Sequence, residues 1–213
     1  MSFDIVCFDC DSTLSWIEGI DELARRIGLG QEMSRLTEAA MNGEVPLEAV
    51  YGQRLSLIRP DQSSIDWLAD LYIEEIVQGV KEVFETLSAQ GKELHIISGG
   101  IRQALLPLAR YLDLDESHVH AVNVYFDEEG CYRGYDQASP LARTGGKADC
   151  CRALSRPQAS VVMIGDGKTD METRQAGAYV IGFGGVTERP IVREQADVFI
   201  AGPSMTAILP YIL

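Results

Sequence analysis

A short stretch at residues 8–14, Phe-Asp-Cys-Asp-Ser-Thr-Leu, directly follows the largely apolar residues 3–7 and contains two carboxylates. The apolar segment is rich in strand formers and predicts a buried strand of a parallel sheet. Alternate side chains of an extended chain share a side, so Asp9 and Asp11 can lie together where this strand ends. Neighbouring carboxylates are unfavourable when buried unless a cation or a proton separates them. The stretch therefore indicates a cation site, and a solvated turn that caps a helix is the alternative.

The chain beyond residue 78 alternates between helical and strand patterns. Strands are predicted at residues 93–97, 119–126, 131–135, 160–164, 178–181 and 198–200, and helices at residues 80–89, 101–112 and 147–154. Such alternation is typical of right-handed crossovers and a parallel sheet covered on both faces. We expect an α/β protein with a Rossmann-like three-layer α/β/α core, a mainly parallel sheet, and a hairpin formed by residues 119–126 and 131–135.

Residues 15–77 differ from the rest because they contain helical patterns without an evident strand. The predicted helices cover residues 18–27, 31–42, 46–58 and 65–71. A small all-helical insertion after the first strand is the simplest explanation. We therefore expect a core domain of residues 1–14 and 78–213 and a helical cap domain of residues 15–77, with hinges near residues 15 and 77.

Charge and composition limit the partners and the compartment. The net charge of −14 argues against nucleic acid, whose affinity for proteins comes mainly from Lys and Arg. A small anion would need a local metal, a cation or backbone amides. The 213 residues contain no apolar run long enough to span a bilayer and no secretory signal pattern, and their five cysteines are an odd number. We expect a cytoplasmic protein without a membrane partner or a disulfide framework.

Two further polar turns follow predicted strands, at residues 98–100 and 165–170. The carboxyl ends of strands meet at one edge of an open α/β sheet, so these turns can converge with residues 9–13. Asp166 and Asp170 would then join Asp9 and Asp11. A group of carboxylates that leaves room for a substrate phosphate suits Mg²⁺ better than Ca²⁺. An ordinary solvated turn at residues 165–170 is the alternative.

Candidate anion-binding groups accompany the acidic ones. Ser98, Gly99 and Gly100 follow a predicted strand and precede a predicted helix, which describes either an anion cradle or an ordinary helix cap. Lys147 begins another predicted helix and is either a cation of the site or an exposed surface residue. Residues 141–148 do not form a nucleotide P-loop, because Leu141 replaces its first glycine and Ala148 its final Ser or Thr.

The chain resembles the haloacid-dehalogenase superfamily of aspartyl phosphatases. Residues 9–13, 97–100, 146–147 and 165–170 carry the resemblance, and residues 18–24, 37–43 and 54–55 of the insertion resemble the phosphoserine phosphatases within it. The resemblance implies that Asp9 is the nucleophile and Asp11 the general acid and base. It also implies that Mg²⁺ is held by Asp9, the main-chain carbonyl of Asp11 and Asp166, with Asp170 in the metal site orienting its waters. Ser98, Gly99 and Lys147 would bind the phosphoryl oxygens.

The same resemblance assigns the choice of substrate to the insertion. Glu18 would face the ammonium group of the substrate and Arg54 its carboxylate. Further contacts are expected from Met41, Gly43, Gly100 and Thr169. Two positions depart from the family pattern: Leu47 stands where relatives often have Phe, and Lys168 replaces a small residue. Lys168 either strengthens phosphate binding or points to solvent.

The implied function is Mg²⁺-dependent hydrolysis of a small phosphate monoester, O-phosphoserine, to serine and phosphate. Two alternatives remain open at this stage. The first is a related phosphatase or a phosphotransferase that uses another monoester or an acceptor such as homoserine. The second is a non-catalytic sensor of a phosphorylated metabolite. The sequence does not distinguish a monomer from a homodimer.

Overall fold

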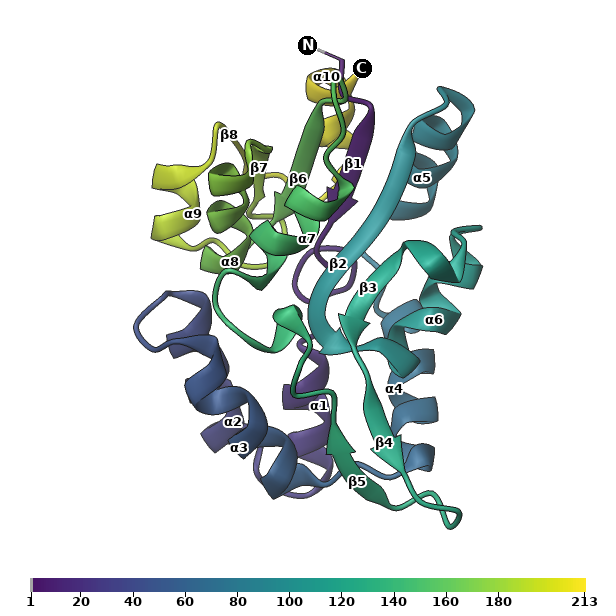
Figure 1. The fold of residues 1–213 in the computed structure, drawn as a ribbon, viewed down its shortest axis with the longest axis vertical. Helices are drawn as coiled ribbons and strands as arrows, with labels where there is room; N and C mark the ends of the chain where they lie inside the picture. Colours follow the sequence, from purple (N-terminus) through teal and green to yellow (C-terminus); the bar gives the residue numbers. More distant parts are fainter. Residues whose placement is uncertain (1) are drawn as a thin grey trace.

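The central sheet of the computed structural model, which describes residues 2–213, contains six parallel strands (Figure 1). The strand order is β3-β2-β1-β6-β7-β8. These strands are β1 (Ile5–Phe8), β2 (Glu93–Ile101), β3 (Val119–Val122), β6 (Val161–Gly165), β7 (Tyr179–Phe183) and β8 (Val198–Ile200). The predicted α/β fold with a mainly parallel sheet is confirmed.

β1 lies in the middle of this sheet, between β2 and β6. All four of its side chains are fully buried, as expected for a strand without polar residues in a sheet covered by helices. Phe8 stacks on Phe84, with 4.9 Å between the ring centroids. The last residue of β1 thus has a fixed position, and Asp9 follows it directly.

Four helices lie between β1 and the next core helix, and the others follow in alternation with the strands (Figure 1). The first four are α1 (Gly19–Arg26), α2 (Gly30–Met41), α3 (Leu47–Ile58) and α4 (Gln62–Glu74). The remaining helices are α5 (Val80–Ala89), α6 (Arg102–Tyr111), α7 (Gly146–Leu154), α8 (Lys168–Met171), α9 (Pro190–Gln195) and α10 (Leu209–Ile212).

The helical insertion is joined to the sheet by two segments that pair with each other. Ser15 and Ile76 form an isolated antiparallel bridge. The Trp16 N–H donates to the Glu75 carbonyl at 2.8 Å, and the Val77 N–H donates to the Leu14 carbonyl at 2.9 Å. The insertion therefore begins and ends at one place, beside the carboxyl end of β1.

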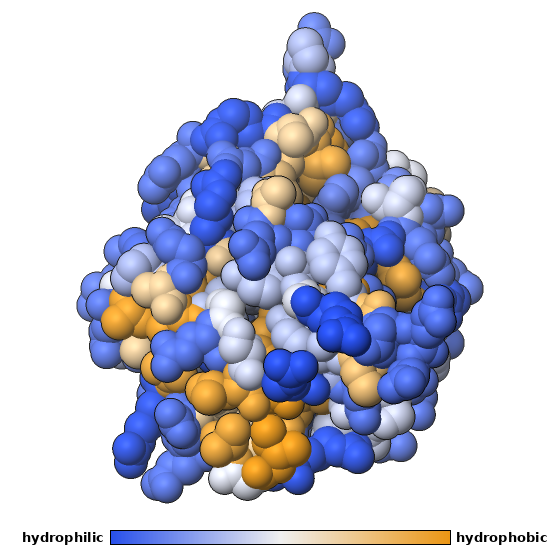
Figure 2. Space-filling model, turned by 60° about the horizontal axis from the view of Figure 1, so that its bottom comes forward, coloured by the Kyte–Doolittle hydropathy of each residue, from blue (hydrophilic) through white to orange (hydrophobic). Residues whose placement is uncertain are grey.

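The outer face of the insertion carries apolar surface. Figure 2 looks toward the end of the molecule at the bottom of Figure 1 and shows an apolar patch among mostly hydrophilic side chains. Three large apolar side chains of the insertion, Trp16, Ile27 and Leu57, are between 44% and 51% exposed. No helix of residues 2–213 has the length and apolar character needed to cross a membrane.

The expected hairpin differs from the structure in its first strand. Residues 119–126 form two strands: β3 joins the main sheet parallel to β2, and β4 (Val124–Phe126) pairs antiparallel with β5 (Tyr132–Tyr135). The side chain of Gln103 bonds both backbone groups of Val124, at 2.7 and 3.2 Å. These bonds satisfy the backbone at Val124 outside the main sheet, so the strand is interrupted at Asn123.

Candidate active site

The polar turns that follow β1 and β6 and the polar carboxyl end of β2 meet at one edge of the sheet, where the insertion covers them. Together they line a pocket that contains ten of the predicted site residues: Asp9, Asp11, Glu18, Met41, Arg54, Ser98, Gly99, Lys147, Asp166 and Thr169. Ile20, Leu47, Tyr51, Leu141 and Arg143 complete the lining. Gly43, Gly100 and Asp170 are not part of the lining. Convergence at the carboxyl ends of the strands, as expected for an open α/β sheet, produces this pocket.

A tight turn after β1 holds the first two carboxylates. The N–H groups of Thr13, Leu14 and Ser15 all donate to the carbonyl of Cys10, at 2.9 to 3.2 Å. Ser12 adopts a left-handed backbone conformation with φ of 51°. This turn reverses the chain within a few residues, so Asp9 remains beside β6 while Asp11 faces the insertion.

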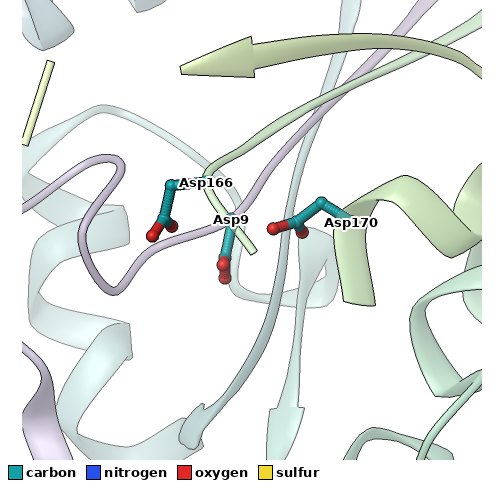
Figure 3. A group of neighbouring side chains, drawn as sticks. All are labelled: Asp9, Asp166 and Asp170. Atoms are coloured by element: carbon teal, nitrogen blue, oxygen red, sulfur yellow. The ribbon is translucent and has the colours of Figure 1, made fainter. Parts of the chain in front are cut away.

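Asp9, Asp166 and Asp170 form a buried group of carboxylates (Figure 3). One oxygen from each lies within 4.8 Å of the other two. The Lys147 Nζ lies 2.7 Å from Asp9 Oδ2 and 2.7 Å from Asp170 Oδ1. Gly165 permits this approach, because a Cβ there would lie 2.2 Å from the Asp170 Cγ. Lys147 thus pairs with two of the three buried carboxylates, and the oxygen ligands of this group suit a hard divalent cation.

Burial changes the protonation of this group. It raises the pKa of Asp170 to about 7, against the opposing effect of Lys147. Burial also raises the pKa of Asp166 well above its usual range, with Arg189 acting in the opposite direction. Carboxyl groups that are difficult to ionise without a cation are expected where a cation belongs.

Asp11 has a separate environment from the other three carboxylates. Its Oδ1 accepts hydrogen bonds from the Tyr72 hydroxyl at 2.5 Å and from the Gly19 N–H at 3.2 Å. Burial raises the pKa of Asp11 to about 6, and the bond from Tyr72 opposes this shift. Asp11 is therefore an acid that can gain or lose a proton near neutral pH.

The turn after β2 differs from the expectation. β2 continues to Ile101 and α6 begins only at Arg102, so residues 98–100 lie within the strand and not at a helix N-terminus. The buried Ser98 hydroxyl accepts from the Gly100 N–H at 3.0 Å. Residue Gly100 therefore orients Ser98 from behind the pocket instead of lining it.

The insertion contributes charges of both signs to the pocket. Glu18 accepts from the Ser12 hydroxyl at 2.8 Å, and burial raises the pKa of its carboxyl well above the usual range. The buried Arg54 donates through Nη1 to Thr37 Oγ1 at 2.7 Å. Thr37 in turn donates to Asp21 at 2.5 Å, so two buried residues orient the guanidinium group.

Lys168, which replaces a small residue, contributes nothing to this pocket. Its ammonium group donates to Gln195 Oε1 at 3.1 Å, and its stem lies against Gly43, where a Cβ would be 3.1 Å from the Lys168 Cγ. Both residues line a separate hollow between the insertion and α8. Neither of the two roles expected for Lys168 describes this contact.

Four polar residues at the site, Tyr51, Tyr72, Arg143 and Arg189, were missed from the sequence. Arg189 donates through Nε to Asp166 Oδ2 at 3.2 Å, and its Nη2 lies 3.6 Å from Glu18 Oε1. The hydroxyl groups of Tyr51 and Tyr72 bond the Gly99 carbonyl and Asp11. Arg189 comes from a loop far along the chain, and the tyrosines lie within helical patterns, so only the fold brings them here.

Comparison with known proteins shows which family the chain resembles. The model of the haloacid dehalogenase-like hydrolases matches residues 3–177. The chain belongs to this family. The predicted relationship is thus confirmed, and the pocket of this hydrolase lies at the sheet edge that carries the matched turns.

Two curated relatives and a solved structure illustrate the similarity. The chain is 36% identical to the phosphoserine phosphatase of Bos taurus, over 93% of this chain and 89% of that protein. It is 37% identical to the chloroplastic phosphoserine phosphatase of Arabidopsis thaliana, over 92% of this chain and 68% of that protein. A phosphoserine phosphohydrolase-like protein from Francisella tularensis shares the fold, with a TM-score of 0.89, 24% identity and full coverage of both chains.

Proposed function

We propose that this hydrolase is a Mg²⁺-dependent phosphatase that converts O-phosphoserine to serine and phosphate, the last step of serine biosynthesis. The named relatives of Bos taurus and Arabidopsis thaliana are phosphoserine phosphatases. The pocket supports the proposal because it offers a partner for each charge of this substrate. Lys147 suits the phosphate, Glu18 suits the ammonium group and Arg54 suits the carboxylate.

One atom of Arg54 supports the substrate assignment most strongly. Its Nε is buried and has no hydrogen-bond partner in residues 2–213. A buried N–H of a charged group without a partner is costly, whereas Nη1 of the same side chain is bonded to Thr37. A substrate carboxylate would supply the missing acceptor. Sugar phosphates and phosphoethanolamine have no carboxylate.

The proposed chemistry uses the two acids of the turn after β1. Asp9 attacks the phosphorus atom, and the bond from phosphorus to the serine oxygen breaks while Asp11 protonates that oxygen. Asp11 then takes a proton from the water that hydrolyses the aspartyl-phosphate. Lys147, Ser98 and Gly99 bind the phosphoryl oxygens throughout.

The carboxylate group of this site fits Mg²⁺ in its chemistry. Asp9, Asp166 and Asp170 offer buried oxygen ligands close together. The main-chain carbonyl of Asp11 would add a further oxygen, as the resemblance to the family implies. When bound, Mg²⁺ would neutralise negative charge that gathers between the phosphate and these carboxylates. The protein residues meanwhile hold the nucleophile in place and exclude water.

We also propose that residues 15–77 act as a cap domain on a core of residues 1–14 and 78–213. The Thr144 N–H and hydroxyl donate to Glu48 Oε2 at 2.9 and 2.8 Å, and these bonds join α3 to the loop before Lys147. A closed cap excludes bulk water from the pocket, and opening admits the substrate and the one water that hydrolyses the intermediate. Unchanged turnover after the cap is crosslinked to the core would contradict this motion.

Binding of Mg²⁺ should stabilise the protein more at pH 8 than at pH 5.5. Because the pKa of Asp170 is raised to about 7, the metal-free protein loses stability as pH rises from about 4 toward 7. Mg²⁺ binds the ionised carboxylates and removes this loss. At saturation we expect an increase in the thermal midpoint of about 5–10 °C at pH 8 and less than about half of that at pH 5.5.

This expectation is checked by thermal unfolding with and without Mg²⁺ at both pH values. At each pH, the difference between the thermal midpoints with and without Mg²⁺ reports the effect of the metal site alone, since groups elsewhere contribute equally to both midpoints. Asp170→Asn removes one ligand and should lose most of the increase. An equal increase at both pH values, or one that Asp170→Asn retains, would show that the cation binds elsewhere.

Release of serine and phosphate from O-phosphoserine tests the proposed reaction. We expect equal amounts of both products with Mg²⁺, and no change in phosphate yield when homoserine is added. Formation of phosphohomoserine with a matching decrease in free phosphate would show that the protein is a phosphotransferase. Absence of release above a control without enzyme would favour a non-catalytic sensor.

A further inference from the structure

Tyr72 brings a buried hydroxyl from the helical insertion to Asp11. The side chain belongs to α4 and is fully buried. Its hydroxyl donates to Asp11 Oδ1 at 2.5 Å. The end of α4 is tied to the segment after β1 by the bond between Trp16 and Glu75. The contact therefore joins the helical insertion to the turn that carries both acids.

A glycine makes room for this hydroxyl. A Cβ on Gly19 would lie 2.0 Å from the Tyr72 oxygen. The Gly19 N–H donates to Asp11 Oδ1 at 3.2 Å. Gly19 thus serves the contact twice, since its missing side chain admits the hydroxyl and its amide bonds the same carboxylate oxygen.

The two donors distinguish the two oxygens of Asp11. A carboxyl oxygen has two acceptor sites, and on Oδ1 both face donors. Within residues 2–213, no hydrogen bond is donated to Oδ2. A proton on Oδ1 would have to displace one of these bonds, so the proton of Asp11 belongs on Oδ2.

We infer that Tyr72 is a positioning residue for the acid step: with Gly19 it keeps Asp11 Oδ1 as an acceptor, so that Oδ2 carries the proton given to the leaving oxygen. This inference rests on the proposed role of Asp11 as the general acid. The step moves one proton from Oδ2 to the oxygen released from phosphorus, and Tyr72 keeps its own proton throughout. A neutral phenol is the ordinary state of tyrosine at neutral pH.

The contribution of Tyr72 to kcat/KM should depend on how strongly the departure of the leaving group requires protonation. An alkoxide or a phenoxide leaves poorly without a proton, whereas p-nitrophenoxide leaves well unaided. General acids contribute roughly 10²- to 10⁴-fold, and a mispositioned acid loses part of this. A structural role for Tyr72 would instead affect all substrates equally.

The test compares kcat/KM of Tyr72→Phe and of the unchanged protein on phenyl phosphate and p-nitrophenyl phosphate, which have nearly the same shape. We expect about a 10- to 100-fold loss on phenyl phosphate and less than about a threefold loss on p-nitrophenyl phosphate. Turnover of p-nitrophenyl phosphate also shows that the variant is folded. On O-phosphoserine, kcat should fall about 10- to 100-fold while KM changes less than about threefold.

Two further variants separate this inference from the proposed function. The quantity compared is the ratio of kcat/KM on p-nitrophenyl phosphate to kcat/KM on phenyl phosphate. Tyr51→Phe removes another hydroxyl of the pocket, which bonds the Gly99 carbonyl, and should leave this ratio unchanged. Asp11→Asn should raise that ratio at least as much as Tyr72→Phe does. If Asp11→Asn raises the ratio and Tyr72→Phe does not, or if kcat of Tyr72→Phe on O-phosphoserine is unchanged, the role of Tyr72 is wrong. If Asp11→Asn leaves the ratio unchanged, the acid role of Asp11 itself is wrong.

Discussion

Asp9→Asn should abolish turnover and leave the fold intact. The substitution replaces the attacking carboxylate by an amide of the same shape, which is not a nucleophile for phosphorus. We expect kcat to fall by at least about 10⁴-fold, as removal of a covalent nucleophile does elsewhere. The amide oxygen can still accept the hydrogen bond that the Cys10 N–H donates to Asp9 Oδ1 at 2.7 Å. The thermal midpoint should therefore stay within about 5 °C of the unchanged protein.

Asp4→Asn is the matched control, since Asp4 stands just before the same strand. Its side chain is exposed and accepts from the Ser160 N–H at 2.8 Å, outside the pocket. Its activity should be unchanged. Near-normal activity of Asp9→Asn with retained structure would exclude an aspartyl-phosphate on Asp9.

Arg54→Lys should remove the preference for a substrate with a carboxylate. Arginine has enough donors to bond Thr37 and a carboxylate together, whereas a lysine ammonium cannot reproduce this planar arrangement. A hydrogen bond between charged groups contributes about 1.5–3 kcal/mol, which corresponds to roughly 10- to 100-fold in kcat/KM. We expect this loss on O-phosphoserine and a change of less than about threefold on phosphoethanolamine, which has no carboxylate.

Arg59→Lys is the control for this substitution. Arg59 follows the same helix, and its side chain is exposed and outside the pocket. It should keep normal kcat/KM on both substrates. An equal loss of Arg54→Lys on both substrates would mean that Arg54 supports the cap and does not select the carboxylate.

The fold could be predicted from the sequence because the core strands and helices have clear patterns. The β8 strand at Val198–Ile200 and the α5 helix at Val80–Ala89 have the predicted bounds. One error occurred where a side chain competes with the sheet for backbone bonds. Gln103 interrupts a predicted strand at Asn123 in this way, and no local pattern predicts a contact between residues 21 apart.

The pocket was predictable where its residues occur at the carboxyl ends of strands. Asp9, Ser98 and Asp166 were found because the carboxyl ends of parallel strands must meet. Tyr72 and Arg189 were missed because the spacing around them gives no sign of a polar role. A tyrosine in a helical pattern predicts packing, and only the approach of α4 to the turn after β1 reveals its bond to Asp11.

The most direct test of the proposed activity is a specificity profile of the purified protein with Mg²⁺. The values of kcat/KM on O-phosphoserine, O-phosphothreonine, phosphoethanolamine and sugar phosphates are compared under one condition. We predict that O-phosphoserine exceeds phosphoethanolamine and the sugar phosphates by at least about 10-fold, since only a substrate with a carboxylate satisfies Arg54 Nε. Equal or higher kcat/KM on phosphoethanolamine or a sugar phosphate would contradict the proposed function.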